Sequence, residues 1–284
     1  MAKLTVALAT YNEEKTLRDC LDSIKEIADE IVIVDGTSSD GTVAIAREFG
    51  AKVSIVPNQK IFHINKQKAL DLSSNEWILQ LDADERVSKK LAAEISKVIT
   101  MTDEESREYQ KSLSNKDLFL RHQHLLDSRD GKIGNDDASY AAFFIPRLNY
   151  FLGRYLRHGG VYPDGVIRLV KKKQAHFPAK DVHEQIVVDG KVGWLQHDLI
   201  HMADPTFTRY LQRNSRYIDL IATQIYPKGL FGFIDYVVLK PAWWFLVTFI
   251  RHKGFLDSWQ GFVFSFFSAL RFPRAYFRYQ KRDR

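Results

Sequence analysis

The chain has 284 residues, of which 45% are apolar and 27% are charged, as is typical of a globular protein with a substantial core. Its one cysteine, Cys20, excludes a disulfide framework and a zinc site built from cysteines. The opening "MAKLTVALATYN" lacks the long apolar segment of a signal peptide, and no run of 18 or more apolar residues is free of charge. We therefore expect neither a leader nor a membrane-spanning helix.

The net charge of +6 is confined to the end of the chain. Residues 1–228 hold 32 basic and 32 acidic residues, whereas residues 229–284 hold 9 basic and 3 acidic ones. The same end segment carries 17 of the 36 aromatic residues. This predicts a balanced body over residues 1–225 and a basic, aromatic tail over residues 226–284.

Apolar strand-like segments alternate with helix-like segments over the first hundred residues. Strands are expected at residues 4–9, 30–36, 51–57 and 76–82. Helices are expected at about residues 17–24, 40–49, 65–72 and 88–99. Ser88 is a plausible N-cap for the last helix, and Gly50 is placed to end the second. Such alternation predicts an α/β fold, a parallel sheet with helices on both faces.

Residues 100–140 interrupt this alternation. They are polar and lack apolar periodicity, although "LFLRHQHLL" within them is compatible with a strand or a short helix. We expect an excursion from the sheet that lies near the ligand site. Strand-like pieces return over residues 141–203, and residues 203–225 are predicted to form a helix.

Polar acceptor groups follow three of the predicted strands. Thr10, Tyr11 and Glu13 follow the first, Asp35 ends the second, and "LQLDADERV" places Asp82, Asp84 and Glu85 behind the fourth. In an open parallel sheet, ligands bind beyond the carboxyl ends of the strands. The crowded carboxylates belong either to a solvated strand end or to a cation site, and their mutual repulsion favours a cation.

Several other α/β chemistries lack their motifs in this chain. There is no G-x-G-x-x-G after the first strand, no P-loop and no G-x-S-x-G elbow. Phosphatases with a DxD nucleophile generally carry it after the first strand. The remaining interpretation is a metal-dependent site without a covalent nucleophile. Two alternatives stay open: a sugar-phosphate nucleotidyltransferase, although "ATYNEE" lacks the expected glycine- and arginine-rich loop, and a non-catalytic membrane-docking module.

Four segments in order resemble the family 2 glycosyltransferases, which have a GT-A, Rossmann-type nucleotide-sugar-binding fold. They are "VALATYNEEKTLRDCLDSI", "EIVIVDGTSSDGT", "NKQKALDLSSNEWILQLDADE" and "DVHEQIVVDG". More narrowly, "FLGRYLRHGGVYPDGVIRLVKK" followed by "VHE" is similar to the bacterial lipopolysaccharide-core beta-glucosyltransferases of that family. Val161 stands where a tryptophan is expected in that segment.

The resemblance implies an inverting transfer from a nucleotide sugar, with UDP-glucose as the expected donor, to a lipopolysaccharide-core or other lipid-linked acceptor. It assigns donor binding to Thr10, Tyr11, Glu13, Asp35, Lys66 and Asp82. Asp84 and His201 would bind Mg²⁺ or Mn²⁺, and Glu184 of "VHE" would be the catalytic base. Arg168, Tyr162 and Asp164 are weaker candidates for acceptor contacts.

The aromatic tail is predicted to associate with a membrane. Lys240-Pro241 interrupts its longest apolar run, which leaves the pieces short for spanning, so we expect amphipathic helices in the interface. Trp243, Trp244 and Trp259 suit the headgroup level, and the basic residues suit an anionic leaflet. This indicates a peripheral protein on the cytoplasmic face of the bacterial inner membrane. A helical subdomain packed on the body, or a dimerisation hairpin, is the alternative. Nucleic-acid binding is not expected, because the aromatics cluster in apolar runs.

Overall fold

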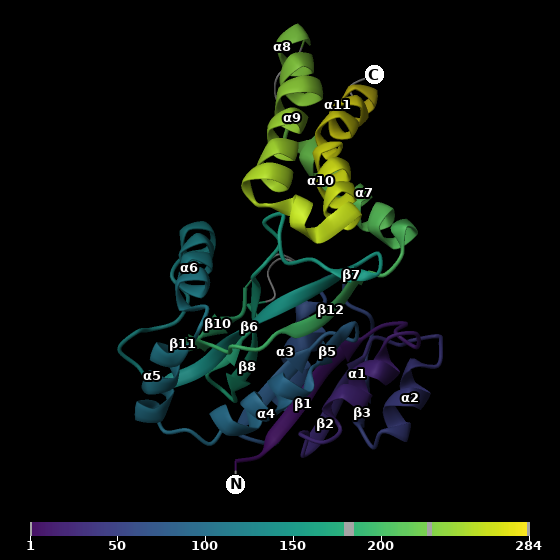
Figure 1. The fold of residues 1–284 in the computed structure, drawn as a ribbon. Coiled ribbons are helices and arrows are strands. Elements are labelled where there is room, and N and C mark those ends of the chain that lie inside the picture. The colour runs from purple at the N-terminus through teal and green to yellow at the C-terminus, as the bar shows by residue number, and fades with distance from the viewer. Residues whose placement is uncertain (1, 179–184, 226–228, 283–284) are drawn as a thin grey trace. The chain divides into compact units, whose positions relative to one another are not determined.

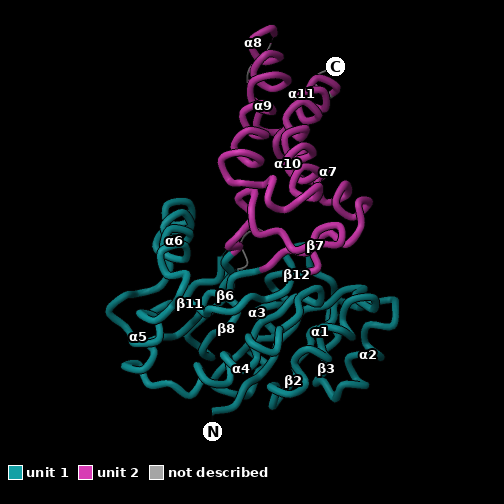
Figure 2. Tube along the Cα trace, viewed as in Figure 1, with its two compact units in different colours: residues 1–147, 165–201 teal, residues 148–164, 202–284 magenta. Residues whose placement is uncertain are grey.

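The computed structural model describes residues 2–178, 185–225 and 229–282 (Figure 1). The chain forms two compact units, coloured separately in Figure 2. Unit 1 comprises residues 1–147 and 165–201, and unit 2 comprises residues 148–164 and 202–284. The units are divided differently from the predicted body and tail, since residues 148–164 and 202–225 group with the tail.

The central sheet begins as the parallel sheet that the sequence predicts. Its strand order is β3-β2-β1-β4-β8-β6-β12-β5, with β11 and β7 also paired to β6. β1 pairs in parallel with both β2 and β4, whereas β8 joins β4 antiparallel. The strands are β1 (Leu4–Thr10), β2 (Glu30–Asp35), β3 (Lys52–Ile55), β4 (Trp77–Leu81), β5 (Glu85–Val87), β6 (Tyr140–Phe151), β7 (Arg154–Tyr155), β8 (Asp164–Lys171), β9 (Ala175–His176), β10 (Val187–Val188), β11 (Lys191–Trp194) and β12 (Leu199–Asp204).

The four helices predicted over the first hundred residues are confirmed. Ser88 caps α4 as expected, since its Oγ accepts a hydrogen bond from the Leu91 N–H at 3.2 Å. Gly50, which follows α2, has a φ of +71°, a conformation that favours glycine. The helices of unit 1 are α1 (Leu17–Ile24), α2 (Thr42–Glu48), α3 (His63–Leu72), α4 (Lys89–Val98), α5 (Asp103–Ser112) and α6 (Lys116–Asp130).

The polar stretch 100–140 is mostly helical, whereas the sequence predicted an irregular excursion and left only "LFLRHQHLL" open as a strand or a short helix. Thr102 opens α5 with a capping box, in which its hydroxyl and the Glu105 side chain satisfy each other's backbone N–H groups. In α5 only Ser106 is buried, and in α6 only Phe119 and Leu126 are. The two helices therefore lack the apolar stripe by which an amphipathic helix is recognised.

Apolar side chains cover both faces of the parallel strands. Leu8 and Leu79 belong to one hydrophobic cluster, together with α1 and α4 residues. Their chain neighbours Ala7 and Ile78 belong to a second cluster, which includes residues of α3 and α6. Successive residues of a strand point to opposite faces, so the sheet is buried between two helical layers. The predicted α/β fold with a mostly parallel sheet is thus confirmed.

Unit 2 is mainly helical. Its helices are α7 (Phe207–Thr223), α8 (Gly229–Phe233), η1 (Ile234–Leu239), α9 (Lys240–Phe245), η2 (Leu246–Arg251), η3 (Gly254–Asp257), α10 (Ser258–Ala269) and α11 (Arg271–Arg282). From α8 to η2 these segments form one continuous helix, Gly229–Arg251, in which stretches of π-helix alternate with α-helix.

The predicted interruption at Lys240-Pro241 is wrong. Pro241 follows the π-helical segment η1 within this continuous helix, and a local π-helical adjustment is one way in which a helix accommodates the missing N–H of a proline. By length and composition this helix could cross a bilayer, and only 6% of its most apolar window is buried within the described structure. The expectation that the pieces of this run are too short to span is therefore also wrong.

Candidate active site

The carboxyl ends of β1 and β2 bring Thr10 and Asp35 together. The two residues face each other in the strand register, and the Thr10 hydroxyl donates to Asp35 Oδ2 at 2.9 Å. Asp35 is fully buried and also accepts hydrogen bonds from the Ser38 N–H and hydroxyl at 2.8 and 2.6 Å. The loop after β2 is thereby tied to the strand end, and Ser38 joins the site without having been expected from the sequence.

Hydrogen bonds hold the loop after β1 in place, while the ring of Tyr11 in this loop remains exposed to solvent. The Glu13 N–H donates to the Thr42 hydroxyl at 2.7 Å, and the Glu13 carboxylate accepts from the Thr16 hydroxyl at 2.6 Å. The Asn12 side chain accepts from the Ser39 N–H at 2.8 Å. Tyr11 remains 49% exposed, so its ring is accessible beside the buried Thr10 and Asp35.

Two of the three crowded carboxylates are paired with cationic side chains of the protein. Asp82 contacts Lys66 Nζ and Arg168 Nη2, each at 2.5 Å. Arg168 Nη2 also contacts Glu85 at 2.8 Å, and Arg147 Nη1 lies 3.6 Å from the same carboxylate. Glu85 is fully buried, so these two guanidinium groups take the place of water around its carboxylate.

This pairing corrects the explanation offered for "LQLDADERV". The sequence argument favoured a bound cation over a solvated strand end, whereas Asp82 and Glu85 are already paired with cationic side chains of the protein. Burial alone would raise the pKa of Asp82, but the charges of Arg168 and Lys66 outweigh it and hold that pKa well below 3.8. Asp82 therefore stays a carboxylate with or without a metal.

Strand pairing explains why the sequence did not reveal this network. β8 runs antiparallel to β4 with Leu169 opposite Leu79, so Arg168 lies beside the end of β4 although it is 86 residues away from Asp82. One local signal was present. Gln80 is a polar residue in an otherwise apolar buried strand, and its side-chain oxygen accepts a hydrogen bond from Arg168.

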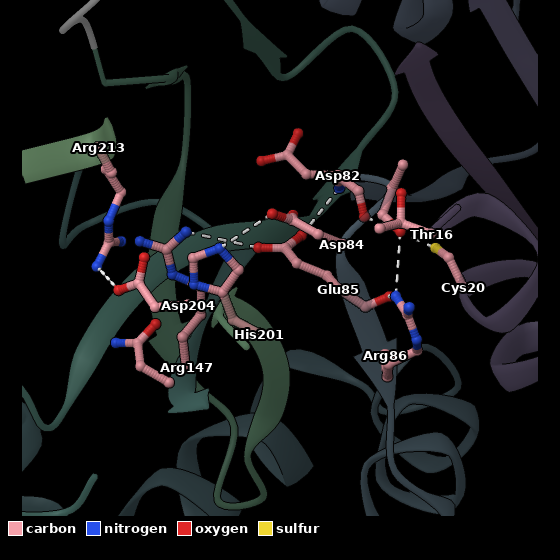
Figure 3. Close-up of polar contacts among 12 residues, drawn as sticks. Thr16, Cys20, Asp82, Asp84, Glu85, Arg86, Arg147, His201, Asp204 and Arg213 are labelled. Carbon is pink, nitrogen blue, oxygen red and sulfur yellow. Dashed lines mark hydrogen bonds and ion pairs between the residues drawn. The ribbon is translucent and has the colours of Figure 1, made fainter. Parts of the chain in front are cut away.

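Asp84 lies opposite His201 (Figure 3). His201 faces Glu85 in the pairing of β12 with β5, and its Nε2 lies 3.6 Å from Asp84 Oδ2. Both side chains are mostly buried. Within the described residues, no group of three or more His, Cys, Asp or Glu side chains is arranged to hold a metal. The structure thus offers a carboxylate and an imidazole at a spacing that one divalent ion could bridge, with its other ligands coming from substrate and water.

The remaining predicted residues lie in different surroundings. Arg168 is buried in the ion-pair network, which is not how an acceptor-contacting residue is usually placed. Tyr162 and Asp164 belong to unit 2, where Arg157 stacks over the Tyr162 ring and Asn149 Nδ2 donates to Asp164 at 3.1 Å. Glu184 lies outside the described residues.

Comparisons with known proteins point to one family. The model of glycosyl transferase family 2 matches residues 5–143. An uncharacterized glycosyltransferase of Rickettsia felis is 28% identical over 96% of this chain and 88% of its own length. The lipopolysaccharide core biosynthesis glycosyltransferase LpsC of Rhizobium meliloti is 24% identical over 94% of this chain and 91% of its own length.

A solved structure, glucosyl-3-phosphoglycerate synthase of Mycobacterium tuberculosis with Mn²⁺, UDP and glucosyl-3-phosphoglycerate, also matches. It is 24% identical, covers 35% of this chain and 40% of its own, and has a TM-score of 0.31. This score is too low for the likeness to support an inference about this chain.

Proposed function

Because the chain belongs to glycosyl transferase family 2 through residues 5–143 and is a transferase, we propose that it moves a sugar from a UDP-sugar to a lipid-linked acceptor. The observation that carries the proposal is the shared sheet edge. There, Thr10 of β1 meets Asp35 of β2, Lys66 of the helix α3 meets Asp82 after β4, and Asp84 meets His201 of β12. UDP-glucose is the first donor to test, and a lipopolysaccharide core is the first acceptor, as the name of the LpsC relative suggests.

The first two strand ends suit the nucleoside of the donor. The exposed Tyr11 ring offers a surface on which uracil can stack. Asp35, assigned to ribose hydroxyls, is fully buried beside it, so the donor would reach its carboxylate only after the loop that carries Ser38 moves. The hydrogen bonds from Thr10 and Ser38 hold Asp35 in place before the donor arrives.

The third strand end suits the diphosphate. Asp84 and His201 would hold Mg²⁺ or Mn²⁺, which supplies positive charge to the diphosphate as it leaves. Lys66 and Arg168 are already engaged by Asp82, so they fix that carboxylate and leave Asp84 as the group directed to the metal. We assign Asp82 to a donor hydroxyl on the same argument.

Glu184 is proposed as the base of an inverting displacement. A single displacement needs one carboxylate to take the proton of the acceptor hydroxyl, on the face opposite the leaving group. Its position in "VHE" supports this role, which is a proposal from the sequence.

Unit 2 is proposed to hold the enzyme at the cytoplasmic face of a membrane, where the acceptor lies in the bilayer and the donor in the cytosol. Many large apolar side chains of unit 2 are exposed, among them Phe231, Leu239, Trp243 and Trp259. Exposed apolar surface on this scale needs a non-aqueous partner. A lipid surface supplies it, and the basic residues of the same segment favour anionic headgroups.

The test is calorimetric titration of UDP with and without Mn²⁺, using wild type, Asp84→Asn and, as a matched control, the exposed Asp137→Asn. We expect metal-dependent UDP binding that Asp84→Asn abolishes and Asp137→Asn keeps. Binding that is indifferent to Mn²⁺ would remove the metal role of Asp84. Absence of UDP binding in every case would overturn the transferase proposal and favour a membrane-docking module.

A further inference from the structure

Two distant segments of unit 2 meet at the turn that links the long helix to α10. The Gly159 N–H donates to the carbonyl of His252 at 2.9 Å. Gly160 has a φ of +77°, and a Cβ at this position would lie 3.4 Å from the His252 ring. A Cβ would make only ordinary contact there, so glycine is favoured by the backbone conformation, which other residues rarely adopt, where the loop 157–160 packs on the turn 251–257.

A buried carboxylate fastens the loop to the turn. Asp257 is 3% exposed, and its Oδ2 accepts hydrogen bonds from the Arg157 and His158 N–H groups at 3.0 and 2.7 Å. Its Oδ1 lies 2.9 Å from His158 Nδ1. The imidazole is thereby oriented through Nδ1, and a ring held in this way can present its other nitrogen, Nε2, to a ligand.

The surface around this junction carries cationic groups without acidic ones. Arg251, His252 and Lys253 are consecutive and exposed. Asp257 is the only acidic residue between positions 236 and 282, and its carboxylate is occupied inside the junction. Residues 152–163 contain no acidic residue either. An anion bound by these two segments would meet several donors, and neither segment supplies a carboxylate other than the occupied one of Asp257.

Apolar side chains lie directly beside these cations in the chain. Phe255, Leu256 and Trp259 are about half exposed. Phe255 continues into a row of rings, since Phe249 contacts both Phe255 and Phe262 with ring centroids 6.2 and 5.8 Å apart. A ligand that satisfies both features must join an anionic group to an apolar body.

We propose that the loop 157–160 and the turn 251–257 together bind the phosphate of a lipid headgroup, with Phe255, Leu256 and Trp259 among the adjoining acyl chains. A soluble phosphate would leave the aromatic side chains without a partner, and an uncharged lipid would leave Arg251 and Lys253 without one. This assignment rests on the proposed function and deepens it. The lipid phosphate held at this junction would belong to the lipid-linked acceptor or to a neighbouring lipid of the same bilayer.

The experiment measures flotation of the full-length protein with phosphatidylcholine vesicles, with or without phosphatidic acid. Arg251→Gln/Lys253→Gln is compared with Lys89→Gln/Lys90→Gln, which removes the same charge from exposed positions of α4. We expect the first variant to lose roughly thirtyfold in partitioning to phosphatidic acid vesicles, about fivefold for each basic residue near the surface. The second variant should partition like wild type.

Two further variants test the loop and the aromatic side chains. His158→Gln should weaken binding to phosphatidic acid vesicles severalfold, and unchanged binding would overturn the two-segment site. Brominated acyl chains should quench wild-type tryptophan fluorescence more than that of Trp259→Phe. Equal losses for Arg251→Gln/Lys253→Gln and the α4 variant would also overturn the proposal. Circular dichroism checks that each variant is folded.

A phosphate control separates the two possible sources of the anion. Inorganic phosphate, compared with chloride at equal ionic strength, should neither displace the protein from vesicles nor raise its unfolding temperature. If it does both, the site takes a soluble phosphate and the lipid assignment fails. UDP titration of the wild type is run in parallel without lipid, so a wild-type protein that binds UDP but does not bind phosphatidic acid vesicles rejects only this site. The converse result rejects only the proposed transfer.

Discussion

In unit 1 the charged groups Glu85 and Arg168 are buried at the edge of a sheet, whereas in unit 2 the aromatic side chains Phe231 and Trp243 are 86% and 65% exposed. Each arrangement reverses the usual distribution in a water-soluble protein. The buried charges are tolerated because each has a partner of opposite sign within hydrogen-bonding distance. The exposed rings have no comparable cover among the described residues, which is why we assign their partner to the membrane.

The largest expected effect is that of Glu184→Gln, which should lower sugar transfer without changing the vesicle binding proposed for unit 2. Transfer should fall by about a hundredfold to ten-thousandfold, because the acceptor hydroxyl loses its base. UDP affinity and vesicle binding should stay at wild-type values, since neither needs that proton transfer. The measurement is transfer from radiolabelled UDP-glucose to lipid extract, with the exposed Glu108→Gln as control. Unchanged turnover would remove Glu184 from its role.

Removing the shared cation of the buried network should give a large loss of stability. Arg168→Gln leaves Asp82 and Glu85 with fewer opposing charges, and breaking a buried pair in this way costs about 3–5 kcal/mol. Lys173→Gln, an exposed change just beyond the same strand, should change the free energy of unfolding by less than about 0.5 kcal/mol. Urea denaturation measures both. If Arg168→Gln is as stable as wild type, the network does not hold the strand end.

An aromatic substitution in each unit tests the contrast directly. Phe144→Ala, in the core of unit 1, should cost about 3–5 kcal/mol of unfolding free energy because it leaves a cavity. Trp243→Ala should cost less than about 0.5 kcal/mol in the absence of lipid, since the ring is mostly exposed. In vesicle flotation the order of the two variants should be reversed: Trp243→Ala should bind vesicles more weakly than Phe144→Ala. A large loss of stability for Trp243→Ala in lipid-free solution would instead indicate that protein covers the ring.

The smallest expected effect is on stability in acid. It involves Glu30, which begins β2 at the end of the parallel strands opposite to the candidate active site. Burial would raise the pKa of Glu30, but hydrogen bonds from Lys52, Thr5 and Ser74 outweigh it and hold the pKa at about 2, below its ordinary 4.5. A depressed folded-state pKa stabilises the protein above the unfolded pKa, and this contribution is lost as the pH falls from about 4.5 to 2. Thermal unfolding of wild type and Glu30→Gln should therefore converge over that range. A constant difference down to pH 2 would show that the carboxylate charge is not responsible.

The elements of the first hundred residues were predictable because their signals are local. A strand buried on both faces is a short apolar run, and an amphipathic helix repeats its apolar residues over a few turns, as Leu17, Cys20, Leu21 and Ile24 do in α1. The groups that follow such strands must gather at one edge of a parallel sheet. Thr10, Asp35 and the "DAD" carboxylates could therefore be proposed as one site without a structure. α5 and α6 could not be predicted firmly as helices, because they carry almost no apolar face.

By itself, then, the sequence determined the alternating sheet, the edge at which its polar groups collect and the separate character of the aromatic tail, because short-range periodicity and composition encode them. Only the tertiary structure decided which cations neutralise Asp82 and Glu85, since Arg168 reaches them through pairing with a strand far away in the chain. It also decided that the helix continues past Pro241 and that the loop 157–160 closes on Asp257. These depend on contacts between distant residues, which no local pattern specifies.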